Sequence, residues 1–208
     1  MPVDAKYAGF NLLLLTPHVS GGLIRYESLL VTNHGGGGPV TFRTLSSSER
    51  SCGALSNGID GTDAHLWPKV QHATEEFAAV VETRSPDPTD VELVQHLFQL
   101  LAWVILLYIL LAGVSPNYGS WQPQNCTISQ QSERRNTIHV PPVPIPSVPG
   151  YFGTRLSTVL LVRNNGQVFF VERDIWELTD GGVPSKSHPP TERRFNFKLD
   201  IESSTESY

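Results

Sequence analysis

The N-terminal third of the chain alternates short apolar runs with glycine-rich turns, a pattern typical of β-strands. Gly9 to Leu15 and Leu23 to Thr32 are predicted strands, joined by a turn around TPHVSGG. The second strand leads into NHGGGGPV, which matches neither GxGxxG nor a GK[ST] ending and is interpreted as a backbone-permissive turn. GALSNG, further along, is predicted to form a third short strand with its turn.

The apolar period changes to helical spacing at Trp67. WPKVQHATEEFAAVVETR predicts a helix in which Pro68 is tolerated in the first turn. After the break at SPDP, a second helix is predicted over TDVELVQHLFQLLA, which opens with a capping-box spacing of Thr89 and Glu92. The expected buried stripes are Val70, Ala73, Phe77 and Val80-Val81 on the first helix, and Leu93, Leu97 and Leu100-Leu101 on the second.

Residues 103–120, WVILLYILLAGVSPNYGS, form an uncharged and strongly apolar run. A membrane span needs about twenty apolar residues and is usually oriented by flanking basic residues, and no basic cluster flanks this run. A membrane anchor, a buried helix and an insertion foreign to the fold remain alternatives. The insertion is favoured over the anchor, because a membrane span within a layered domain is topologically awkward.

The C-terminal third again has strand patterns. STVLLV and QVFFVERD flank Arg163-Asn164-Asn165-Gly166, and an Asn-Gly turn between β-branched runs predicts a hairpin. RRFNFKLDI alternates apolar and polar residues and predicts a final half-exposed strand. Strands followed by two helices and then strands predict a layered α+β domain.

Composition is compatible with one sizeable core, since 39% of the 208 residues are hydrophobic. The net charge of −5 argues against a general nucleic-acid binder, which needs a basic face. Cys52 and Cys126 are too few for a disulfide framework, so a reducing compartment is expected. His72 and His96 have no partner at metal-ligand spacing, and neither a metal nor a cofactor is expected.

Three stretches carry a resemblance to a known family: NHGGGGPV, GALSNGID with the WPKV that follows it, and GYFGTRLSTVLLVRNNGQVFFVERDIWE. Together with RRFNFKLDI they resemble the later part of the NRDE family, also called the transport and Golgi organisation protein 2 family. The resemblance covers residues 7–102 and 121–201. That family is similar to N-terminal-nucleophile hydrolases, so the resemblance implies an incomplete αββα sandwich with antiparallel sheets and two main helices.

The chain departs from the family pattern at its N-terminus. Members typically begin Met-Cys, which after loss of the methionine leaves a cysteine carrying both a thiol nucleophile and an α-amino base. This chain begins Met-Pro, contains no Asn-Arg-Asp-Glu tetrad and lacks the strands expected before YAGFNLLLL. We therefore expect no catalytic residue in the chain as written, and no amide hydrolysis. Cys52 and Pro2 are discounted as substitutes for the nucleophile.

The resemblance implies two surviving pocket positions, Asn57 and Arg155. Asn57 resembles an asparagine that donates to the oxyanion in related cysteine amidases, and Arg155 resembles an arginine that enters the same pocket. The alternatives stay open: Asn57-Gly58 is also an ordinary tight-turn pair, and an arginine beside a strand can simply protect a sheet edge.

The expected domain is a single NRDE-type domain over residues 1–201, without its N-terminal strands, interrupted at 103–120 and followed by a disordered tail at 202–208. The resemblance implies a role in Golgi organisation and protein secretion, with a cytoplasmic or Golgi-associated location. Two alternatives are a cysteine amidohydrolase, if the true N-terminus carries Met-Cys, and a module that handles haem or lipid. The expected partner is a small-molecule or lipid-like ligand and not nucleic acid, with membrane association only through 103–120.

Overall fold

The computed structural model describes residues 8–83, 90–104, 135–145 and 149–200. It divides into two compact units, and each is treated by itself. Unit 1 consists of residues 1–78, 161–169 and 196–208, and unit 2 of residues 79–160 and 170–195. The apolar run at 103–120, apart from its first two residues, and the predicted tail at 202–208 lie outside the described residues.

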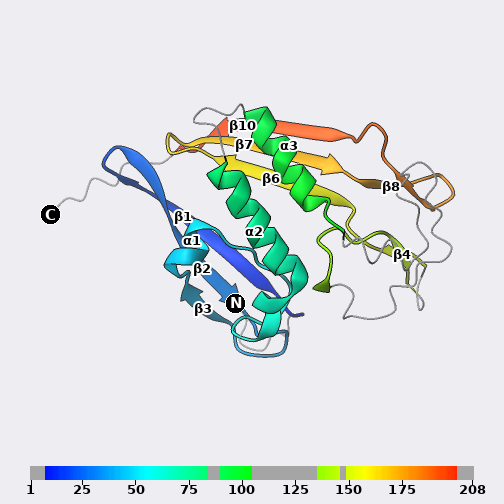
Figure 1. Ribbon diagram of the computed structural model, residues 1–208, viewed down its shortest axis with the longest axis horizontal. Helices are drawn as coiled ribbons and strands as arrows, with labels where there is room; N and C mark the ends of the chain where they lie inside the picture. The colour runs from blue at the N-terminus through cyan, green and yellow to red at the C-terminus, as the bar shows by residue number, and fades with distance from the viewer. Residues whose placement is uncertain (1–7, 84–89, 105–134, 146–148, 201–208) are drawn as a thin grey trace. The chain divides into compact units, whose positions relative to one another are not determined.

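The chain has the predicted α+β class, with antiparallel sheets and few helices, consistent with an α+β sandwich (Figure 1). The two long helices are confirmed. The helical elements are α1 Ser47–Ser51, a 3₁₀ turn at Asp63–Leu66, α2 Pro68–Glu82 and α3 Asp90–Leu101. The strands are β1 Asn11–Ser20, β2 Leu23–Thr32, β3 Thr41–Thr44, β4 Val143–Pro144, β5 Tyr151–Phe152, β6 Leu156–Val162, β7 Gln167–Asp174, β8 Trp176–Leu178, β9 Pro184–Lys186 and β10 Glu192–Lys198.

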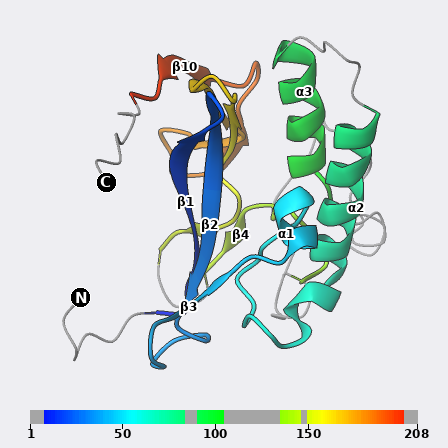
Figure 2. The same cartoon turned by 90° about the vertical axis from the view of Figure 1, so that its left-hand side faces the viewer.

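The first sheet has the order β1-β2-β3 and belongs to unit 1. β1 and β2 pair antiparallel from Asn11↔Thr32 to Ser20↔Leu23 and run alongside each other over their full length (Figure 2). The predicted turn around TPHVSGG was too wide, because only Gly21 and Gly22 form it, with φ of 61° and 77°. Two glycines at positive φ match the twist of a tight hairpin, and Pro17 is tolerated because β1 is an edge strand of this sheet.

Further predictions in this region had mixed outcomes. The NHGGGG turn is confirmed, with positive φ at Gly35, Gly36 and Gly37. The predicted strand at GALSNG is wrong, since residues 53–58 form a loop. β3 and α1 were not predicted, although Ser46 and Glu49 form a complete capping box that the sequence displays as Ser-x-x-Glu.

The second sheet has the order β10-β7-β6. The predicted hairpin between β6 and β7 is confirmed, because Arg163 N donates to Gln167 O at 2.8 Å and Gly166 adopts a φ of 84°. The final strand is confirmed as β10, with Phe195 and Phe197 about half exposed. Two short pairs, β4-β5 and β8-β9, were not predicted.

The helix stripes were correct in part. On α2, Val70 is buried as predicted, whereas Val81 is 46% exposed. On α3 the most buried residues are Val94 and Phe98, not the predicted leucines, which are half-buried. The buried face of α3 is therefore shifted by one residue from the predicted one. On this face, the Arg173 guanidinium lies 4.0 Å from the centroid of the Phe98 ring.

Candidate functional site

The loop that contains Asn57 is held by a side chain from the first strand. Asn11 Nδ2 donates to the carbonyl oxygens of both Ser56 and Gly58, at 2.7 Å each. One amide group thus bridges the residues on either side of Asn57. Each such bond contributes about 0.5–1.5 kcal/mol to stability, so the loop has a defined conformation without a strand partner.

The surroundings of Gly58 distinguish the Asn57-Gly58 pair from an ordinary exposed turn. Gly58 is buried, and a Cβ added there would lie 2.3 Å from Ala64 Cβ and 3.0 Å from the Trp67 ring. Those distances leave no room for a side chain. The glycine is therefore required for close packing against the 3₁₀ turn and Trp67, directly before α2, and this packing fixes the backbone beside Asn57.

The Asn57 side chain is exposed and has a defined orientation. Its Oδ1 accepts from Ser56 Oγ at 3.1 Å and from Lys69 Nζ at 3.5 Å. An ammonium group can only donate, so Lys69 identifies the oxygen end of the amide. The Nδ2 group is consequently the end of Asn57 that can donate to a ligand.

A cavity of about 600 Å³ lies beside this loop, within unit 1. Its polar lining includes Asn11, Arg43, Glu49, Ser56 and Asp60. It brings together residues from β1, β3, α1 and the loop after α1, which are far apart in the sequence.

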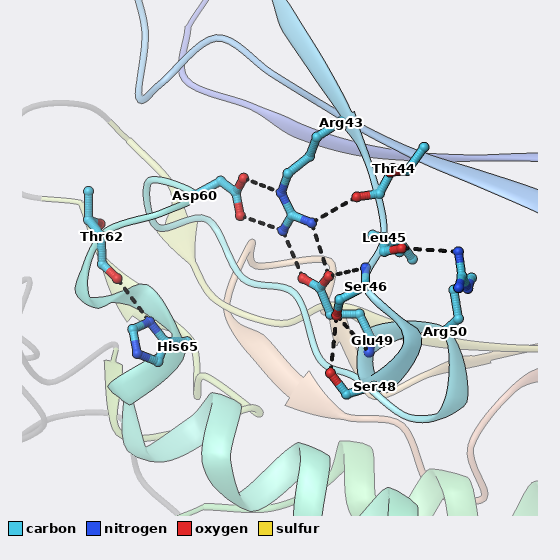
Figure 3. Close-up of polar contacts among 10 residues, drawn as sticks. All are labelled: Arg43, Thr44, Leu45, Ser46, Ser48, Glu49, Arg50, Asp60, Thr62 and His65. Atoms are coloured by element: carbon cyan, nitrogen blue, oxygen red, sulfur yellow. Dashed lines mark hydrogen bonds and ion pairs between the residues drawn. The ribbon is translucent and has the colours of Figure 1, made fainter.

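Arg43, which lines this cavity, is the centre of a cluster of charged side chains. Figure 3 shows the contacts of this cluster. Its guanidinium donates to Asp60 at 2.7 and 2.8 Å and to Glu49 at 3.0 and 2.7 Å. The hydrogen bonds from Arg43 lower the pKa of Glu49 to about 2 and lower that of Asp60. Both carboxylates are therefore charged at neutral pH, and Arg43 is fully used in joining β3 to α1 and the loop.

Cys52 is engaged in a structural contact. Its Sγ donates to the Thr74 carbonyl oxygen of α2 at 3.4 Å, so the thiol holds the end of α1 against that helix. This contact gives Cys52 a role in packing, and its exclusion as a nucleophile stays a prediction. In the described ranges, no three His, Cys, Asp or Glu side chains gather in a way that could hold a metal ion.

Arg155, the second predicted pocket residue, belongs to unit 2 and lies directly before β6. Its side chain is exposed, and its carbonyl oxygen accepts from the backbone nitrogens of Ile175 at 2.8 Å and Trp176 at 3.1 Å. Asp174 has a lowered pKa, mainly because Arg193 donates to it at 2.6 and 3.0 Å, with a smaller effect from the charge of Arg155. Asn57 thus belongs to unit 1 and Arg155 to unit 2.

The sequence did not single out Asn11, Arg43 or Lys69. Asn11 bonds to Gly58, 47 residues away, and Arg43 bonds to Asp60, 17 residues away. The other partner of Arg43, Glu49, lies on α1, which was not predicted. No local spacing in the sequence therefore reveals these contacts. Lys69 lay within the quoted WPKV motif, but nothing in that motif indicates that its ammonium meets Asn57.

One of two comparisons with known proteins gives a match. A family model described as Transport and Golgi organisation 2 matches residues 3–177. A comparison with curated proteins found no match. Among the described residues, no helix has the length and apolar character that crossing a membrane requires.

Proposed function

The chain belongs to the Transport and Golgi organisation 2 family, also called the NRDE family, and from this premise we propose that it acts in Golgi organisation and protein secretion by binding a ligand without catalytic turnover. The location proposed for this role is cytoplasmic or Golgi-associated. The ligand is a small or lipid-like molecule, and a nucleic acid is not expected for a chain of net charge −5.

One observation carries the proposal: the loop that presents the hydrogen-bond donor of Asn57 is held in place by Asn11, while the Cys52 thiol donates to the backbone of α2. Asn11 fixes the loop on both sides of Asn57, and the oxygen end of that amide is engaged. Cys52 donates to the backbone of α2. A preorganised donor favours recognition of a ligand carbonyl or carboxylate, whereas acyl transfer also needs an activated nucleophile.

Arg155 is proposed as a second ligand-binding position in its own unit. Its guanidinium is exposed, and its backbone is fixed by two hydrogen bonds. An arginine held in this way can bind an anionic group through two parallel donors. The role of Arg155 is tested separately from that of Asn57.

The second candidate function is a cysteine amidohydrolase of the N-terminal-nucleophile type. The Asn57 amide favours it, because donors of this kind stabilise the oxyanion in acyl transfer. Such an enzyme would use an N-terminal cysteine in place of Cys52.

The test is incubation of the full chain with a panel of N-acyl amides, followed by mass spectrometry of both protein and small molecules. We expect the amides to stay intact and the bound fraction to fall in Asn57→Ala. The matched variant Cys52→Ala/Cys126→Ala, which carries no thiol, should behave like the parent. Release of free acid by the parent but not by the thiol-free variant would show turnover that depends on a thiol of this chain, and would contradict the binding proposal.

A further inference from the structure

Lys69 is a half-buried cation at the edge of the Asn57 loop. It is the second residue of α2, and its Nζ lies 3.5 Å from Asn57 Oδ1 and 5.3 Å from the centroid of the Trp67 ring. It forms no ion pair within the part of the chain that the structure describes. Burial lowers the pKa of Lys69, as expected for an ammonium that loses water without gaining a counter-charge.

Two partly buried arginines, unlike Lys69, are paired with carboxylates. Arg43 faces Glu49 and Asp60, and Arg173 donates to Glu192 at 2.6 and 3.0 Å. Partly buried charges in proteins are normally paired in this way, because an unpaired charge is costly to desolvate. An amide oxygen and an aromatic ring compensate only part of that cost for Lys69.

We propose that Lys69 and Asn57 together form a recognition site for the carboxylate of a small ligand. The Lys69 ammonium keeps donors that its single bond to Asn57 does not use, and the Nδ2 group of Asn57 adds a neutral donor. One cation with one amide donor matches the single charge and two oxygens of a carboxylate. A phosphate dianion would be under-compensated at this site.

Three structural features hold the two groups together. Asn11 fixes the loop that carries Asn57, and the Trp67 ring supports the Lys69 ammonium. Gly58 packs directly against the same ring, so the loop and the start of α2 share one contact surface. The pair is therefore preorganised, which lowers the entropic cost of binding.

This inference rests on the proposed binding function and gives its ligand a chemical class. The test uses benzoate, neutral benzamide and phenyl phosphate, titrated against the full chain while the Lys69 side-chain NMR signals are followed. We expect saturable binding of benzoate, a rise in the pKa of Lys69 on binding, and at least tenfold weaker binding of benzamide and phenyl phosphate.

Variants separate recognition from folding. Lys69→Met keeps the apolar stem beside Trp67 and should weaken benzoate binding about tenfold or more, while Lys69→Arg should retain most of it. Asn57→Asp should also weaken binding, because a carboxylate replaces the donor. Lys198→Met, at an exposed position on β10, serves as the matched control and should bind like the parent.

Several results would overturn the carboxylate site. These are no benzoate binding by the parent, equal binding of benzamide, tighter binding of phenyl phosphate, or unchanged binding by Lys69→Met. Each of them leaves the amide-turnover assay unaffected. Failure of this inference is therefore distinguishable from failure of the proposed function.

Discussion

At the scale of residues, the candidate site depends on side chains that replace backbone partners. Asn11 Nδ2 donates to the carbonyl oxygen of Ser56, 45 residues further along, and Asn33 Oδ1 accepts from the backbone nitrogen of Phe10 at 2.8 Å. These side-chain amides satisfy backbone groups that have no neighbouring strand to bond to. The conformation of the Asn57 loop therefore depends on one residue of β1.

Replacement of Asn11 tests this dependence. Asn11→Ala removes two hydrogen bonds and leaves two carbonyl groups to find other partners, so we expect a loss of about 1–2 kcal/mol in the free energy of unfolding. Amide exchange at residues 57–59 should also become faster. Gln71→Ala, at an exposed position on α2, is the control for denaturant unfolding and hydrogen exchange. An unchanged exchange rate in the loop would contradict the role of the Asn11 hydrogen bonds in holding it.

His139 gives the molecule a pH dependence that can be assigned to one residue. It is 9% exposed, its Nε2 accepts from Trp176 Nε1 at 3.3 Å, and its Nδ1 is buried with no hydrogen-bond partner in the structure. Burial, with a smaller effect from the charge of Lys186, lowers the pKa of His139 to about 4. The folded state therefore prefers the neutral ring.

The sign of the pH effect follows from this lowered pKa. Below pH 6.5 the unfolded state binds a proton that the folded state refuses, so stability falls as the pH drops from about 6.5 to about 4. At pH 5 the expected loss is about 2 kcal/mol relative to pH 7. His139→Gln should flatten this part of the stability profile in urea unfolding, while the profiles above pH 6.5 stay parallel. An unchanged slope between pH 6.5 and 5 would contradict the assignment.

Sequence reasoning was reliable for residues whose role is local. The Asn-Gly turn at Asn165-Gly166 fixes its hairpin through its own backbone angles. Asn57 was singled out through its resemblance to a family motif, and its role in a site stays a prediction. Lys69 was not singled out, because two features of its surroundings make it a candidate. It forms no ion pair in the described ranges, and its ammonium faces Asn57 Oδ1. Charge compensation is a property of three-dimensional surroundings, which the order of residues does not display.

At the scale of elements, the same distinction separates correct from incorrect predictions. α2 and α3 were predicted because their apolar period spans many residues. GALSNG was assigned to a strand because its composition allows one, but the Asn11 side chain satisfies the carbonyl oxygens that a strand neighbour would have paired. β3 was missed because its four residues are too few for a period.

The edge strand β1 presents an exposed apolar face. Leu12 is 46% exposed and lies in one row with Val31 of β2 and Phe42 of β3, which is 74% exposed. Leu14, 43% exposed, lies on the same face one row further along. An apolar face next to an edge strand favours association between molecules.

This face predicts concentration-dependent self-association of the full chain. In sedimentation velocity over a dilution series, we expect the parent to associate and Leu12→Lys/Leu14→Lys to remain smaller at the same concentration. Leu178→Lys on β8 is the matched control, because Leu178 is 66% exposed but lies outside this face. A parent that stays monomeric at high concentration, or a control with the same effect as the double variant, would refute the role of β1.

At the scale of the whole molecule, the α+β class followed from the order of periodic segments, and the family match over residues 3–177 agrees with the motifs that suggested it. We interpret the chain as a family member in which the loop carrying Asn57 is held in place while the described thiol, Cys52, packs against α2. We propose that the role inferred for it in secretion does not depend on thiol catalysis.

The most direct test is the rate at which a reporter protein is secreted by cells that lack their own member of the family. The parent chain and the thiol-free Cys52→Ala/Cys126→Ala variant are each expressed in these cells at matched levels. The account predicts that both restore secretion to the same extent. Restoration by the parent alone, with the thiol-free variant folded but inactive, would contradict it.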